Sequence, residues 1–195
     1  APQRPQNESS PVKGTEVDPG ILVLVHASPL GHRGCPPLPQ LSTFITAPTV
    51  RFDLTGCGNS SGEPQPMSLT RDVKDIRAVV MHLQQEMGRK VLGLVGFALG
   101  GTAVLLYASQ HRDIKFAVTI AASVTLTNAF SSLLTWSQLQ ELRRQGELQL
   151  PHRDAFGRDT QLRLTAADLD ARPDLSGLAQ CTTTEFLALY SSQDT

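Results

Sequence analysis

The chain has 195 residues, of which 40% are hydrophobic, and its formal net charge is −1. This length and composition allow one well-buried core, and the near-neutral charge does not favour nucleic acid or an anionic membrane as a partner. The apolar runs are far shorter than the ~20 residues of a membrane-spanning helix, and no basic-then-apolar leader opens the sequence. We therefore expect a soluble, cytoplasmic protein with one domain.

The three cysteines are too few and too widely spaced for a disulfide framework. Cys35, Cys57 and Cys181 form no CxxC pair, so the sequence also offers no pattern for zinc or dithiol redox chemistry. We expect free thiols, no metal and no cofactor.

The first half of the chain begins with a polar arm and continues with two β-favouring runs. Residues 1–20 are rich in Pro, Gln and Ser, which predicts a disordered or loose arm. The continuous apolar run 21–26 is typical of a strand buried on both faces of a parallel sheet. A Pro/Gly-rich loop at 27–39, a short helix at 41–45 and a second strand at 49–54 follow.

Apolar residues spaced by three and four positions predict a helix after a glycine-rich loop at 55–63. Ser68 is its expected N-cap and Gly88 its expected end. The apolar stripe comprises Leu69, Val73, Ile76, Val80, Leu83 and Met87. We expect the charged residues of the other face to lie in solvent, and these are Arg71, Asp72, Lys74, Asp75 and Arg77.

The central segment, residues 90–111, has the pattern of a buried strand, a tight turn and a buried helix. Its turn, Gly96-Phe97-Ala98-Leu99-Gly100, matches the Gly-x-Ser-x-Gly pattern of a nucleophile elbow except that Ala98 stands in the serine position. Because glycine-rich turns also join strands to helices in doubly wound sheets of other kinds, the turn alone leaves both interpretations open.

The second half adds two strands and an insertion. A buried strand is expected at 114–122 and a last strand at 185–190, and together with the earlier elements they predict an open, mostly parallel, doubly wound α/β sheet. Residues 124–182 are more polar and are expected to pack over the edge or top of this sheet. Within them we expect an amphipathic helix at 136–145, a hairpin pairing 148–150 with 161–164, and a short helix at 166–171 with Thr165 and Asp168 as a cap pair.

Several motifs in this order resemble the α/β-hydrolase superfamily, within its compact esterase, lipase and serine-aminopeptidase-like group with a small cap. The resemblance covers residues 20–195 and implies a core at 21–195 with a cap insertion at about 124–182, in a sheet truncated at both ends. The matching segments are His26-Ala27-Ser28, the loop Arg51 to Gly62, Asp72 with its helix, the elbow at 96–100, Leu105 to Ala108, and Leu187 to Asp194.

The resemblance also implies roles for individual residues. The backbone N–H groups of Leu99 and Ser28 would form the oxyanion hole, and Asp194 would be the triad acid, with Asp53 the less favoured candidate. The nucleophile is lost at Ala98, and no histidine follows the candidate acid. We therefore expect a protein of a family that hydrolyses esters or amides of small acyl substrates, with this chain either inactive or a fragment of an active enzyme.

Two alternatives to an inactive hydrolase remain open. The first is a binding module for a small apolar or acyl-type ligand or for a partner protein, in which Phe97 would make the pocket drier. In addition, the sheet edge at 185–190 could pair with a strand of another chain. The second, ranked last, is an enzyme whose nucleophile is Cys57 or Ser28 beside His32.

Overall fold

The computed structural model describes residues 18–28, 31–65, 68–122, 134–153, 157, 159–170 and 173–190. Most of the predicted arm, residues 1–17, and the candidate acid Asp194 lie outside these ranges. Within the described ranges, no helix is long and apolar enough to cross a membrane, and no three His, Cys, Asp or Glu side chains are grouped to hold a metal ion.

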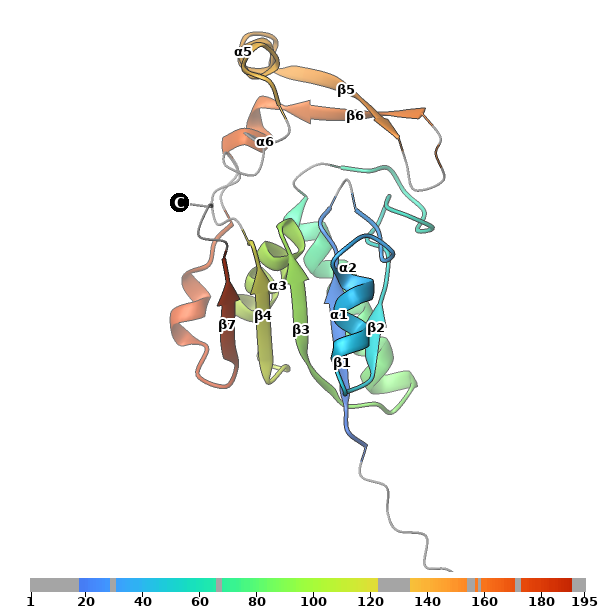
Figure 1. The fold of residues 1–195 in the computed structure, drawn as a ribbon. Helices are drawn as coiled ribbons and strands as arrows, with labels where there is room; N and C mark the ends of the chain where they lie inside the picture. The colour runs from blue at the N-terminus through green and yellow to red at the C-terminus, as the bar shows by residue number, and fades with distance from the viewer. Residues whose placement is uncertain are drawn as a thin grey trace, which may run out of the picture.

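A five-stranded, fully parallel sheet forms the centre of the fold, in the order β2-β1-β3-β4-β7 (Figure 1). This arrangement agrees with the predicted α/β class. The strands are β1 (Ile21–Val25), β2 (Thr49–Arg51), β3 (Val91–Phe97), β4 (Phe116–Ile120) and β7 (Glu185–Leu189).

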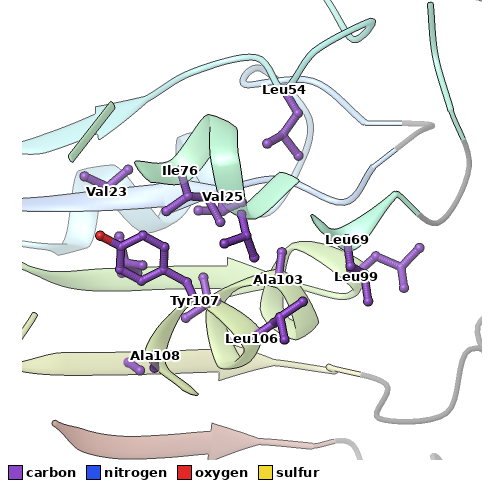
Figure 2. Packing of buried hydrophobic residues seen from close by; sticks show 14 of the residues in the cluster. Val23, Val25, Leu54, Leu69, Ile76, Leu99, Ala103, Leu106, Tyr107 and Ala108 are labelled. Carbon is purple, nitrogen blue, oxygen red and sulfur yellow. The ribbon is translucent and has the colours of Figure 1, made fainter. Parts of the chain in front are cut away.

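Helices cover both faces of this sheet. On one face, α1 (Leu38–Phe44) packs Leu38 against Leu24 and Val95. On the other face, α2 (Leu69–Met81) and α3 (Leu99–Gln110) pack against the remaining apolar side chains of β1 and β3. Figure 2 shows this larger cluster, in which Ile76 of α2 and Tyr107 of α3 meet Val23 and Val25 of β1.

The boundaries of two helices differ from the sequence prediction. Helix α1 begins at Leu38 rather than at residue 41, because a proline is well tolerated in the first turn of a helix. Ser68 occupies the N-cap position of α2, but its side chain makes no capping hydrogen bond. The helix then continues into a π-helical turn, η1 (His82–Glu86), before Gly88 takes a left-handed backbone conformation.

The predicted hairpin and its flanking helices form above the end of the sheet toward which β3 and β4 point (Figure 1). The strands β5 (Glu147–Arg153) and β6 (Asp159–Thr165) pair antiparallel, between α5 (Trp136–Gln145) and α6 (Ala166–Asp170). The Asp168 carboxylate accepts hydrogen bonds from the N–H and hydroxyl of Thr165, as predicted for the cap pair. Leu142 and Leu164 are buried in the main core cluster. The division into a core and an insertion at 124–182 stays a prediction.

A 3-10 helix that the sequence analysis missed, η2 (Ser176–Gln180), packs beside α3 rather than above the sheet. A Cβ added to its Gly177 would lie 2.3 Å from the Ser109 carbonyl oxygen. The last part of residues 124–182 therefore extends down the side of the sheet before β7.

Glycines allow the backbone of α3 to contact the backbone of the sheet directly. A Cβ added to Gly100 would lie 2.3 Å from the carbonyl oxygen of His26, and one added to Gly96 would lie 2.4 Å from the carbonyl oxygen of Gly100. Because these neighbours are backbone atoms, a side chain could fit only if the helix or the strand moved.

We expect Gly100→Ala to lower the free energy of unfolding by about 3 kcal/mol, because the added methyl group overlaps backbone atoms of β1. Gly88→Ala is the control: Gly88 has φ +60° and no atom near its added Cβ, so only the left-handed backbone costs about 1 kcal/mol. Urea unfolding followed by circular dichroism measures both. Equal losses would show that close approach at Gly100 does not constrain the fold.

Candidate functional site

Ala98 connects β3 directly to α3 in a backbone conformation that is rare for a residue with a side chain. Its φ is 50° and its ψ is −121°. The turn is held from both sides, because the Ala98 N–H donates to the carbonyl of Ile120 at 2.8 Å while its own carbonyl accepts from Gly101 at 2.9 Å. Such backbone strain costs about 1–3 kcal/mol and persists only where the surrounding structure imposes it.

The end of β1 lies beside this turn, and a buried histidine joins it to the loop after β2. The N–H of Leu54 donates to Nε2 of His26 at 3.0 Å, and Nδ1 of His26 lies 3.1 Å from the Ala27 carbonyl. These contacts fit a neutral imidazole that carries its proton on Nδ1. Burial lowers the pKa of His26, which favours the same neutral form. His26 therefore has a structural role.

Three buried residues with polar or ionisable side chains form a cluster near the end of β1, namely Ser28, Cys57 and Asp72. Burial raises the pKa of Asp72 to about 7 and that of the Cys57 thiol to about 11. Within the described part of the chain, Oγ of Ser28 and Oδ1 of Asp72 have no hydrogen-bond partner. Burial without full hydrogen bonding disfavours the charged carboxylate, so the folded protein holds the Asp72 proton to a higher pH than the unfolded chain does.

The burial of Asp72 corrects the prediction that the charged face of α2 lies in solvent, because only 1% of this residue is exposed. The sequence contained the signal. Asp72 comes three residues after Leu69 and four before Ile76, which places it on the apolar stripe rather than opposite it.

Two further charged residues of that face of α2, Asp75 and Arg77, form hydrogen bonds or ion pairs with other parts of the chain. The Asp75 carboxylate accepts from the N–H of Thr55 at 2.7 Å and from its hydroxyl at 2.9 Å. Arg77 forms an ion pair with Asp113, which also accepts from the hydroxyl of Tyr107 on α3. These contacts fix α2 to the loop after β2 and to the end of α3.

Asp53 joins the two loops that flank the turn. Its carboxylate accepts from the N–H and the guanidinium of Arg33 at 2.6 and 2.7 Å, and from the N–H of Asn59 at 2.9 Å. Although burial alone would raise its pKa, the hydrogen bonds from Arg33 and Asn59 lower it. These contacts give Asp53 a structural role.

The other histidines make contacts of their own. The N–H of Gly34 donates to Nδ1 of His32 at 3.1 Å, and His82 lies 3.3 Å from Glu86. The ring centroid of His111 lies 4.6 Å from that of Tyr107, with the two rings tilted by 48°, and His152 lies on β5 opposite Thr160.

Cys57 and Phe97 do not suit the roles considered for them from the sequence. Cys57 is buried, and its raised pKa disfavours the thiolate that would act as a relocated nucleophile. Phe97 packs against the apolar cluster of Leu38 and Val95, so its side chain supports the sheet.

The sequence model of the family described as "alpha/beta hydrolase fold" matches residues 20–180. The chain belongs to this family. No curated protein sequence matches it.

Solved structures with the same fold include esterases and lipases. The ferulic acid-bound Est1E from Butyrivibrio proteoclasticus is 18% identical, with a TM-score of 0.56 over 88% of this chain and 79% of its own. The monoacylglycerol lipase from Paleococcus ferrophilus is 16% identical, with a TM-score of 0.55 over 89% of this chain and 85% of its own. Alpha/beta hydrolase domain-containing protein 10 from mouse is 15% identical, with a TM-score of 0.53 over 94% and 86%. At these identities the likeness concerns the fold.

We expect Ala98→Gly to raise the free energy of unfolding by about 1 kcal/mol, because glycine adopts φ 50° without strain and this gain exceeds its entropy cost. Ala103→Gly, in the middle of α3, is the control and should destabilise the protein by about 1 kcal/mol or more. Chemical unfolding measures both. If Ala98→Gly destabilises the protein as much as the control does, the turn is not strained.

We expect the free energy of unfolding to fall as the pH rises from about 4 to about 7, because the folded and unfolded states lose the Asp72 proton at different pH. The folded protein retains this proton up to its pKa of about 7, whereas the unfolded chain loses it near 3.8. The difference is on the order of 4 kcal/mol, present at low pH and lost above pH 7. Asp72→Asn should remove this slope.

Urea unfolding at pH 5 and pH 8 tests this expectation, with Glu141→Gln on the exposed face of α5 as the control. The difference in stability between the unaltered chain and Asp72→Asn should change with pH, while the difference for the control stays constant. A constant difference for Asp72→Asn would mean that Asp72 is ionised in the folded state.

Proposed function

We propose that this chain is a member of the serine-hydrolase family that does not catalyse hydrolysis. The observation that carries the proposal is Ala98, which has the backbone conformation of a strained strand-to-helix turn but a methyl group at the position from which a nucleophile would attack. The chemistry of the family implied by the resemblance is the hydrolysis of esters or amides of small acyl substrates.

In this proposal the two backbone N–H groups that would bind an oxyanion are retained even though the nucleophile is absent. The N–H of Leu99 lies in the first turn of α3, where backbone donors lack a helical acceptor. Ser28 follows the end of β1, whose backbone contacts α3 at Gly100. We assign these two N–H groups to a residual oxyanion hole, which a change of side chain at residue 98 does not remove.

The missing group is the hydroxyl that would attack the acyl carbon. Without it no bond forms between the protein and the acyl group, and the reaction is left with binding and oxyanion stabilisation alone. Binding and oxyanion stabilisation alone accelerate such reactions by roughly 10³- to 10⁴-fold over the reaction in water, which is far below the acceleration of an active enzyme. The assignment of Asp194 as the acid remains part of the proposal, as does the cytoplasmic location.

The test is hydrolysis of p-nitrophenyl acetate and butyrate by the unaltered chain and by Ala98→Ser, with circular dichroism to show that both are folded. We expect no saturable turnover from the unaltered chain. We also expect none from Ala98→Ser, because the described histidines have other contacts.

A fluorophosphonate probe gives an independent readout of an activated serine. We expect no labelling of either protein. Saturable turnover or stoichiometric labelling of the unaltered chain would refute the proposal, and mass spectrometry would then locate the reactive residue.

A binding module for a small apolar or acyl-type ligand is the second candidate. The half-buried methyl group of Ala98, at the carboxyl end of β3, favours it, because parallel α/β sheets bind ligands at that end. Titration with phenyl butyrate, followed by NMR of methyl groups in Ala98 and Leu99, would support binding if the shifts saturate. Shifts that are linear in ligand concentration would count against it.

A further inference from the structure

Two buried polar atoms near the end of β1 have no hydrogen-bond partner among the described residues. They are Oγ of Ser28 and Oδ1 of Asp72, and these residues are only 4% and 1% exposed. A buried polar atom without a partner costs free energy, and most such atoms in folded proteins bond to the protein or to an ordered water molecule. Two of them in one cluster therefore point to a shared partner.

The two side chains come from different parts of the fold. Ser28 follows β1, whereas Asp72 belongs to the first turn of α2. Cys57, in the loop after β2, lies beside them, because its thiol pKa is raised by burial and by the charge of Asp72. Leu69 and Ile76, one turn to either side of Asp72, lie in the apolar cluster (Figure 2). These apolar neighbours offer the carboxyl group no hydrogen bond.

We propose that one water molecule is bound between the Ser28 hydroxyl and the Asp72 carboxyl group and joins the loop after β1 to α2. A hydroxyl and a protonated carboxyl group can each donate and accept a hydrogen bond, as water can. Buried waters typically make about three hydrogen bonds to polar groups that would otherwise be unsatisfied. Because both residues are buried, the bound molecule must be small.

The charge of the cluster favours water over a metal cation. Burial keeps the proton on Asp72 up to its pKa of about 7 and raises the pKa of the Cys57 thiol to about 11, so both groups are neutral in mildly acidic solution. The Arg71 guanidinium, which acts to lower the pKa of both groups, adds positive charge nearby. A neutral molecule that both donates and accepts hydrogen bonds fits these surroundings.

Two other buried side-chain atoms of the described residues also have no hydrogen-bond partner, and both differ from this pair. Nε of Arg71 belongs to a guanidinium that already donates to the carbonyls of Glu63 and Thr55. Oγ1 of Thr119 is on β4, which β3 separates from β1, so this hydroxyl is not part of the cluster. Thr119 is therefore a matched control, a buried hydroxyl without a polar group to share a water.

The bound water has a consequence for the loop after β1. It would connect the Ser28 side chain to α2, so the position of the Ser28 backbone would depend on Asp72. The N–H of Ser28 is one of the two groups that we assign to a residual oxyanion hole. This consequence rests on the proposed function, whereas the water site itself does not.

Urea unfolding at pH 5, where the folded protein retains the Asp72 proton, tests the site. Ser28→Ala should lower the urea midpoint, because it removes a hydrogen bond to the water. Thr119→Val should raise the midpoint, because it removes a buried hydroxyl that has no partner. In a chain that carries Asp72→Leu, an apolar replacement of similar shape, the water is lost and Ser28→Ala should raise the midpoint as well.

The ¹⁷O relaxation dispersion of water measures long-lived internal waters directly. The double variant Ser28→Ala/Asp72→Leu should lose about one such water relative to the unaltered chain. Thr119→Val should lose none. Circular dichroism shows whether each variant is folded.

Two results would overturn the proposal. A folded Ser28→Ala chain that is at least as stable as the unaltered chain would mean that the hydroxyl has no partner to lose. An unchanged ¹⁷O dispersion in the folded double variant would mean that no water is held between these side chains. Neither result depends on ester hydrolysis or on the Ser28 N–H, so this proposal and the proposed function can fail separately.

Discussion

The contact between the first turn of α3 and the end of β1 determines the geometry of the site. Because Gly100 has no side chain, the first turn of α3 reaches the carbonyl oxygen of His26 at the end of β1. The strain at Ala98 is sustained by its hydrogen bonds to Ile120 and Gly101. The geometry of the turn is therefore defined by backbone packing and backbone hydrogen bonds.

Polar groups around that contact join the loops to one another through hydrogen bonds. Asp53 holds Arg33 and Asn59, and His26 holds the backbone of Leu54, so the two loops that flank the turn are tied together beneath it. Both are titratable residues of the kind that could be mistaken for catalytic groups. Their hydrogen bonds and burial explain their perturbed pKa values without a reaction.

The strands and helices could be predicted because their apolar residues repeat with clear periods. The pairing of Leu148 with Leu164 in the hairpin could be predicted for the same reason. The burial of Asp72 was missed because a carboxylate was assigned to the polar face by residue type, although its spacing placed it on the apolar stripe. The π-helical turn η1 carries no comparable signal. The roles proposed for Leu99 and Ser28 would rest on backbone atoms, so residue types alone do not indicate them and only the resemblance to the family did.

The pairing of β7 with β4 has a consequence for how the chain folds. Phe116 lies opposite Glu185, and the whole hairpin region intervenes between them, so this pair closes a far longer loop than the turn within the hairpin does. The hairpin can form as soon as it is synthesised, whereas the outer edge of β4 must wait for the last described strand. During that interval β4 is the exposed edge, so a nascent chain is most susceptible to mispairing there just before β7 emerges from the ribosome.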